Sequence, residues 1–481
     1  MPGPVAADPV ARADEAPVRV RPVLRWYWLW PALLTLAGAG WRLGAPALWA
    51  DELATWGAVR LDWAGLFRLA GRVDVVVLPY FVLAKAWSAV AGTSAVALRL
   101  PSALAMAGAA ALVAVLGARI SGRWVGLLAG LTFAVVPATA RFAQEARPYA
   151  FVVLLAVLAT LLLLRYLDQP SVHTGLCYAG TVALLGAFHL IALLLLLAHA
   201  VVARRRLPLW AAWAGGGVLP VLPLAFWGLR QSGQIAWIPP AQLHVVLATP
   251  DGIFVSGVVG GAVIGLGLLA VARRRVVVAL AAWAVVPVAA LAVAGQFTPL
   301  FWPRYLLYTM PAWVLLAALA LGRLPRTRAL GVVLAVAVLG APSQGAARTP
   351  DGHSQATGQA GGIVAAGYRP GDGIAFSLLE SAPWVARDTV ERYVPADRRP
   401  RDVFLVRPQR TDGRLAATEC ADLTACLDRA DPPRMWVVRL RTQPDPLRGL
   451  GPAKEDLLRS RYRLADLWLV RDLTVALYVR A

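Results

Sequence analysis

Long apolar stretches with almost no charged residues recur along the first two thirds of the chain. An apolar helix of about 20 residues is long enough to cross a bilayer, and lipid favours helices because it cannot satisfy exposed backbone groups. We interpret eleven stretches as membrane spans, at 26–46, 98–117, 124–140, 150–166, 174–187, 188–203, 208–227, 253–272, 276–294, 305–322 and 329–342. The pattern predicts a mainly α, polytopic membrane protein.

The charge pattern supports this class and argues against a nucleic-acid partner. Only 15% of the 481 residues are charged, whereas soluble proteins carry about a quarter. The net charge is +20, but much of the excess lies in short clusters in alternate loops, as expected for cytoplasmic loops. These clusters are Arg119/Arg123, Arg165, Arg204–Arg206, Arg273–Arg275 and Arg323/Arg326/Arg328.

Alternation of these clusters also predicts the topology. Residues 1–25 are polar and rich in Pro and Ala, and we expect a disordered cytoplasmic segment. A further apolar stretch, 75–91, would place every later cluster outside if it crossed the membrane, so we expect it to lie along or dip into the outer leaflet without crossing. A single helix over 174–203 would also restore part of the parity. The predicted transmembrane domain is 26–342, with an outer loop at 47–97.

The composition changes after the last span. Residues 343–361 are rich in Gly, Ala, Ser and Gln and predict a linker, and 362–481 predict a small extracytoplasmic α/β domain. This region contains no nucleotide-binding loop or catalytic triad, which favours an accessory or acceptor-binding role. Cys420 and Cys426 could form a disulfide outside the cytoplasm, and two free thiols are nearly as plausible.

Several ionisable residues fall on the predicted outer face. Asp51 and Glu52 directly follow the first span, where a carboxylate can act as a general base, bind a metal or simply end a helix in solvent. Asp74 and Lys85 are eleven residues apart, close to three helical turns, so they could share a face of an interfacial helix. His189 lies at a predicted turn, where a histidine is more often structural than a metal ligand.

Arginines on this face run against the positive-inside rule and therefore need a partner. The segment RFAQEARPY contains Arg147, which could bind phosphate oxygens in a bidentate manner, and Glu145, which could orient it or bind a sugar hydroxyl. A purely structural ion pair is the alternative. Arg99 and Arg304 lie at the outer ends of two spans, where a phosphate would explain them.

The order of these segments resembles the GT-C membrane glycosyltransferases, in particular the polyprenyl-phosphate-mannose–protein mannosyltransferase and aminoarabinose-transferase-like family. The resemblance covers about 25–310, and its most specific part is RLPSA followed by QEARPYA. The matching segments are Asp51-Glu52, DVVVLPYFVLAK (Asp74–Lys85), Arg99–Ala103, Gln144–Ala150, Phe188-His189 and Arg304–Leu306. The family's His-Pro-Pro is replaced here by Val76-Val77-Leu78, which weakens the case for a metal site.

This resemblance implies transfer of a sugar, mannose or similar, from a polyprenyl-phosphate donor to a glycan, lipid or protein hydroxyl on the outer face. Asp51 would be the general base of a single displacement with inversion. No cofactor is certain, and a divalent cation stays possible. The remaining candidates are expected to bind substrate: Glu52, Asp74, Lys85, Arg99, Glu145, Arg147, Tyr149, His189 and Arg304.

Two other functions remain open from the sequence. A flippase for lipid-linked sugars, or another polytopic transporter, would explain the spans and the cations, but its path should carry polar groups near the middle of the bilayer. An inactive relative that binds an acceptor through its C-terminal domain would explain the missing His-Pro-Pro.

Overall fold

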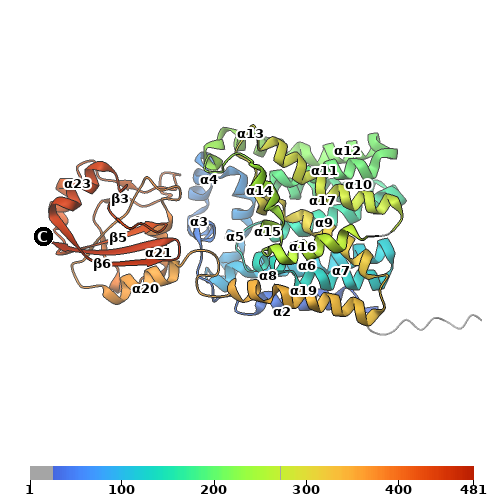
Figure 1. Ribbon diagram of the computed structural model, residues 1–481. Helices are drawn as coiled ribbons and strands as arrows, with labels where there is room; N and C mark the ends of the chain where they lie inside the picture. Colours follow the sequence, from blue (N-terminus) through green and yellow to red (C-terminus); the bar gives the residue numbers. More distant parts are fainter. Residues whose placement is uncertain (1–24, 271) are drawn as a thin grey trace, which may run out of the picture.

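The computed structural model describes residues 25–270 and 272–481. Residues 1–24, which make up nearly all of the predicted disordered N-terminal segment, lie outside the described part of the chain. A helical bundle is followed by a smaller domain with a β-sheet, and this domain lies at one end of the bundle (Figure 1).

The bundle contains eighteen described α-helices, several of which are short. In chain order they are α2 (Leu29–Gly40), α3 (Ala50–Val59), α4 (Trp63–Arg72), α5 (Leu78–Ala91), α6 (Ala95–Ser121), α7 (Arg123–Val135), α8 (Pro137–Ala143), α9 (Tyr149–Asp168), α10 (Val172–Phe188), α11 (Leu195–Ala203), α12 (Leu207–Val218), α13 (Leu222–Arg230), α14 (Leu243–Leu247), α15 (Thr249–Phe254), α16 (Gly257–Leu268), α17 (Arg274–Ala294), α18 (Met310–Leu321) and α19 (Arg326–Ala346). The 3-10 segments η1 (Val75–Val77), η2 (Leu190–Leu194) and η6 (Pro303–Thr309) precede α5, α11 and α18.

By length and composition, five helical segments in the described chain can cross a membrane, namely α6, α9, α17, η6 with α18, and α19. A sixth crossing results if α7 and α8, which meet at 63°, form one bent span. Pro137 begins α8 and cannot donate a backbone hydrogen bond, which accounts for the break. The chain is thus a multi-pass membrane protein, and the count of eleven crossings stays a prediction because the other spans coincide with shorter or interrupted helices.

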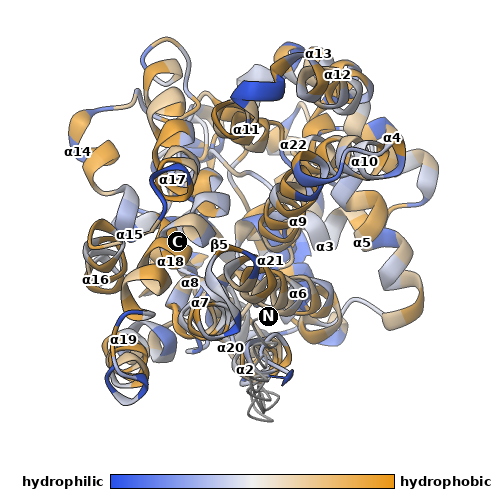
Figure 2. Ribbon diagram, turned by 90° about the vertical axis from the view of Figure 1, so that its right-hand side faces the viewer, coloured by the Kyte–Doolittle hydropathy of each residue, from blue (hydrophilic) through white to orange (hydrophobic). Residues whose placement is uncertain are grey.

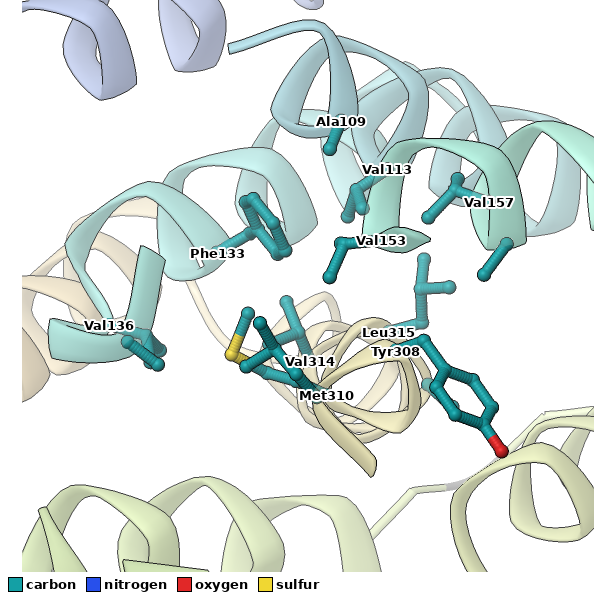
Figure 3. Packing of buried hydrophobic residues seen from close by; sticks show 14 of the residues in the cluster. Ala109, Val113, Phe133, Val136, Val153, Val157, Tyr308, Met310, Val314 and Leu315 are labelled. Carbon is teal, nitrogen blue, oxygen red and sulfur yellow. The ribbon is translucent and has the colours of Figure 1, made fainter. Parts of the chain in front are cut away.

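Apolar side chains of three central helices pack together. Figure 3 shows Ala109 and Val113 of α6, Val153 of α9, and Met310 and Val314 of α18 in one buried cluster. The helix α18 is central in this cluster, and it positions the preceding η6.

Two of the loops predicted to be cytoplasmic meet at one end of the bundle. Arg119 near the end of α6 forms an ion pair with Asp168 at the end of α9, with 2.5 Å between Nη2 and Oδ2. Figure 2 views the end remote from the sheet, and hydrophilic segments lie at the near ends of α17 and α19. This arrangement agrees with a common side for the basic clusters.

The C-terminal domain has a five-stranded sheet with the strand order β2-β1-β5-β7-β6. Strands β2, β1 and β5 are parallel, and β5, β7 and β6 are antiparallel. The elements are α20 (Thr357–Gly367), β1 (Gly373–Ala375), α21 (Val385–Tyr393), β2 (Arg401–Asp402), β3 (Leu405–Arg407), β4 (Thr418–Glu419), α22 (Leu423–Ala430), β5 (Arg434–Leu440), α23 (Pro452–Arg461), β6 (Tyr462–Val470) and β7 (Leu473–Arg480). Separate apolar clusters pack on the two faces of the sheet. Cys420 and Cys426 form a disulfide.

The predicted linker at 343–361 is helical at both ends. Helix α19 continues to Ala346 and α20 begins at Thr357, so only 347–356 is irregular. His353 and Gln355 within this stretch are buried, which a flexible linker would not require. The stretch therefore packs against the bundle as an ordered part of the fold.

Candidate active site

Residues 41–46 form a turn after α2, and α3 begins at Ala50. Asp51 and Glu52 therefore both lie in the first turn of α3. Carboxylates are favourable there because the N-terminal end of a helix carries a partial positive charge. The two side chains differ in environment. Asp51 is 21% exposed, whereas Glu52 is completely buried.

Asp51 lies between two arginines from distant parts of the chain. Its Oδ2 is 3.0 Å from Nη2 of Arg304 in η6 and 4.0 Å from Nε of Arg147, which lies between α8 and α9. Asp51 Oδ2 and the Nε atoms of both arginines lack a hydrogen-bond partner within the described chain. These three atoms are buried, so the polar groups around the partly exposed Asp51 side chain are not all satisfied within the described chain.

Aromatic rings surround the Arg304 guanidinium. Its Cζ lies 5.0 Å from the ring centroid of Trp49, 5.8 Å from that of Tyr149 and 6.0 Å from that of Trp302. Such contacts stabilise a cation and limit its motion. Trp49 and Trp302 were not among the residues predicted for the site, although one position separates Trp49 from Asp51 and Trp302 from Arg304.

Glu52 forms a buried ion pair with Arg99 and, unlike Asp51, is not exposed. The guanidinium is bidentate, with Nη2 2.6 Å from Oε2 and Nε 2.8 Å from Oε1. The backbone N–H of Ala146 also donates to Glu52, at 3.0 Å. Burial raises the pKa of the Glu52 carboxyl, but Arg99 more than reverses this and holds the pKa well below its usual range. The structure thus gives Glu52 and Arg99 a structural position in place of the predicted contact with substrate.

His353 completes this buried cluster and had no sequence signal, because it lies in the predicted linker. Its Nδ1 is 3.3 Å from Glu52 Oε2 and 3.3 Å from Arg99 Nη2. Burial lowers the pKa of His353 to about 3, and the positive charge of Arg141 contributes in the same direction. The imidazole is therefore neutral at physiological pH.

Glu145 and His189 lie near the arginines, as predicted. Glu145 is 1% exposed and accepts a hydrogen bond of 2.7 Å from Arg141, and burial raises the pKa of its carboxyl although Arg141 and Arg304 oppose this. The His189 ring is 5.0 Å from that of Tyr305 and 5.9 Å from that of Tyr149. Glu145 Oε1 and His189 Nδ1 have no hydrogen-bond partner within the described residues.

Asp74 and Lys85 do not lie on one helix, since Asp74 precedes η1 and Lys85 lies in α5. The Lys85 ammonium donates to the carbonyls of Val59 and Leu61, so it caps the C-terminal end of α3. At 1.5 Å per residue this end lies roughly 12 Å along the helix from Asp51. Asp74 has a left-handed backbone with φ of 58°. Burial raises the pKa of its carboxyl, and nearby Arg147 opposes the shift.

A divalent cation does not fit the position beside Asp51. No group of three or more His, Cys, Asp or Glu side chains in the described chain is arranged to hold a metal ion. The guanidinium groups of Arg147 and Arg304 already flank the Asp51 carboxylate and would repel a cation. These two guanidinium groups instead favour an anion that accepts hydrogen bonds from both arginines.

The fold is that expected of a multi-pass membrane protein of the GT-C type. No protein-family model matches the chain, and no curated protein matches it. Two solved structures of ArnT from Cupriavidus metallidurans do match, one bound to undecaprenyl phosphate and one in the apo state. Both have a TM-score of 0.58 and cover 93% of this chain and 97% of ArnT, at 12% and 13% identity. The GT-C fold predicted from the sequence resemblance is thereby confirmed.

Proposed function

We propose that the protein is a membrane glycosyltransferase that uses a polyprenyl-phosphate-linked sugar as donor. One observation carries this proposal. The Asp51 carboxylate lies beside Arg304 and Arg147, 3.0 Å and 4.0 Å away, and each of these three side chains has a polar atom that makes no hydrogen bond within the described chain. A base next to two cations matches the two demands of the reaction, a hydroxyl that loses a proton and a phosphate that leaves.

The transfer is a single displacement at the anomeric carbon. The acceptor oxygen forms a bond to this carbon, the bond between the carbon and the phosphate oxygen breaks, and the configuration inverts. Asp51 takes the proton of the acceptor hydroxyl. Arg147 and Arg304 balance the charge that develops on the polyprenyl phosphate, so the leaving group needs no proton.

The neighbouring residues suit a sugar. Trp49 and Tyr149 present aromatic rings beside Arg304, and such rings stack on the apolar face of a sugar ring. His189 Nδ1 and Glu145 Oε1, which have no hydrogen-bond partner within the described residues, can hydrogen-bond to sugar hydroxyls. The sugar is mannose or similar, and the acceptor is a hydroxyl of a glycan, lipid or protein.

The ArnT structure bound to undecaprenyl phosphate supports a lipid-phosphate donor, because the two chains share a fold over nearly their whole length. The basic clusters at the end remote from the sheet support a cytoplasmic N-terminus. Asp51, the arginines and the C-terminal domain then lie on the outer face of the cytoplasmic membrane, with eleven crossings. No specific observation favours a transporter, since the charged side chains around Asp51 gather at one end of the bundle.

The test is donor consumption by purified protein in liposomes. The donors are polyprenyl-phosphate mannose and polyprenyl-phosphate arabinose, supplied with a mixed pool of envelope lipids, glycans and proteins as acceptors. Asp51→Asn should abolish consumption while the protein still inserts and folds. Asp62→Asn is the matched control, because Asp62 caps α4 on the same outer loop and asparagine caps equally well. Full activity of Asp51→Asn would remove the base from the proposal.

A further inference from the structure

The backbone that leads into α3 is bound by residues some 300 positions further along the chain. The N–H of Leu48 donates to the Tyr393 hydroxyl oxygen, and the N–H of Ala50 donates to Gln355 Oε1, both at 2.7 Å. Further bonds join the Ala47 N–H to the Pro350 carbonyl (2.8 Å), the Thr357 hydroxyl to the Leu48 carbonyl (2.7 Å) and the Trp384 indole N–H to the Ala50 carbonyl (3.2 Å). Five backbone groups directly before Asp51 therefore depend on the C-terminal part of the chain.

Gln355 supplies the cap that α3 lacks in its own sequence. The first N–H groups of a helix have no partner within the helix, and Trp49 at the N-cap position provides no side-chain bond. Gln355 accepts from the first of these groups, and its Nε2 donates to Asp472 Oδ2 at 2.7 Å in the turn between β6 and β7. One buried amide thus connects the sheet of the C-terminal domain to the residue before Asp51.

The same domain holds α3 near its other end. The Arg410 guanidinium lies over Gly57, where a Cβ would be 2.2 Å from its Cζ. Asp388 holds this guanidinium with bonds of 2.6 Å and 3.0 Å. Arg60 just after α3 also pairs with Glu391 of α21, at 2.5 Å. A helix of ten residues is marginal on its own, so these contacts set its position.

We propose that the C-terminal domain, through Gln355, positions the Asp51 carboxylate for transfer, so that the domain is part of the catalytic unit and not a separate acceptor-binding module. This inference rests on the proposed function only in the role of Asp51. Gln355 is a positioning residue, since it reaches Asp51 through the first turn of α3. A displacement of about 1 Å at a reacting group can lower a rate about a hundredfold.

The test compares Gln355→Leu with Tyr462→Phe in the full-length protein in liposomes. Tyr462→Phe also removes one buried hydrogen bond of the C-terminal domain, the 2.8 Å bond to the Pro432 carbonyl, but does not contact α3. We expect Gln355→Leu to lower kcat at least about tenfold with KM for the donor unchanged, because both arginines remain. Amide hydrogen exchange in residues 50–53 should accelerate in this variant and stay unchanged in the control.

A double variant distinguishes loss of the hydrogen bonds that position α3 from general damage to the fold. Gln355→Glu combined with Asp472→Asn keeps both hydrogen bonds, because the carboxylate accepts from the Ala50 N–H and from the new amide. This double variant should recover kcat to within about threefold of the wild type. Equal kcat in Gln355→Leu and Tyr462→Phe, or unchanged exchange at 50–53 in Gln355→Leu, overturns the positioning role. If the wild type consumes neither donor, the proposed function fails, and the exchange comparison still decides whether Gln355 positions α3.

Discussion

Breaking the buried pair of Glu52 and Arg99 distinguishes a structural role from a role in substrate binding. Both side chains are fully buried, and Glu52 accepts two bonds from Arg99, one from Ala146 and lies 3.3 Å from His353. Arg99→Met leaves a buried carboxylate without its counter-charge. Removal of one partner of such a pair costs about 3–5 kcal/mol, so we expect a loss of this size in the free energy of unfolding.

Substitution of the other partner, Glu52, should lower the free energy of unfolding by less than Arg99→Met does. In Glu52→Gln, Arg99 keeps the carbonyl acceptors of Leu43 and Pro46 at 2.9 Å and Ala47 at 3.4 Å, so we expect a loss of about 2 kcal/mol. The double variant should be more stable than the sum of the two losses predicts, by about 2 kcal/mol.

The measurement is reversible unfolding of the detergent-solubilised protein by SDS titration, alongside donor consumption. Strictly additive losses would show that the two side chains do not interact as the structure has them. If Arg99→Met loses activity but keeps its full stability, Glu52 and Arg99 bind substrate, as the sequence predicted.

Two further predictions concern the contacts of α3. The pKa of His353 is about 3 in the folded chain and near 6.5 in the unfolded chain. As the pH falls from 6.5 towards 3, only the unfolded state gains a proton, so the free energy of unfolding decreases as the pH decreases. Between pH 7.5 and pH 5 this loss is about 2 kcal/mol, and His353→Gln should remove it from the pH dependence of SDS unfolding; an unchanged pH profile would contradict a buried neutral imidazole. Gly57→Ala should cost about 1–3 kcal/mol because the new Cβ meets Arg410, whereas Gly71→Ala in α4, with no atom within 4 Å, should be tolerated. Equal stability of the two alanine variants would refute the close contact.

Much of the bundle could be predicted because membrane spans have a local signal. The predicted stretches at 98–117, 150–166 and 276–294 coincide with α6, α9 and α17 to within a few residues. The GT-C fold was also predictable. The short motifs occur along the chain in the order that this family has, although no family model matches the chain. The number of crossings was harder, because proline and short apolar runs break helices without ending a span.

The candidate site was predicted in part. Asp51, Arg147 and Arg304 come together as expected, since each follows or opens a helix at the same end of the bundle. Lys85 does not join them, because its ammonium caps α3 at the far end. Spacing along the chain placed Lys85 on the correct helix, but it could not say which carbonyls that helix would meet.

The sequence by itself determined the apolar helices, their approximate ends and the set of charged residues that cannot face lipid, because these depend on local composition and length. Only the tertiary structure decided which of two adjacent carboxylates is buried and which is open. It also decided that Gln355 caps α3 from 305 residues away. Neither has a local signal, because the partner of a buried polar group is chosen by the folded arrangement of distant segments and not by its neighbours in the chain.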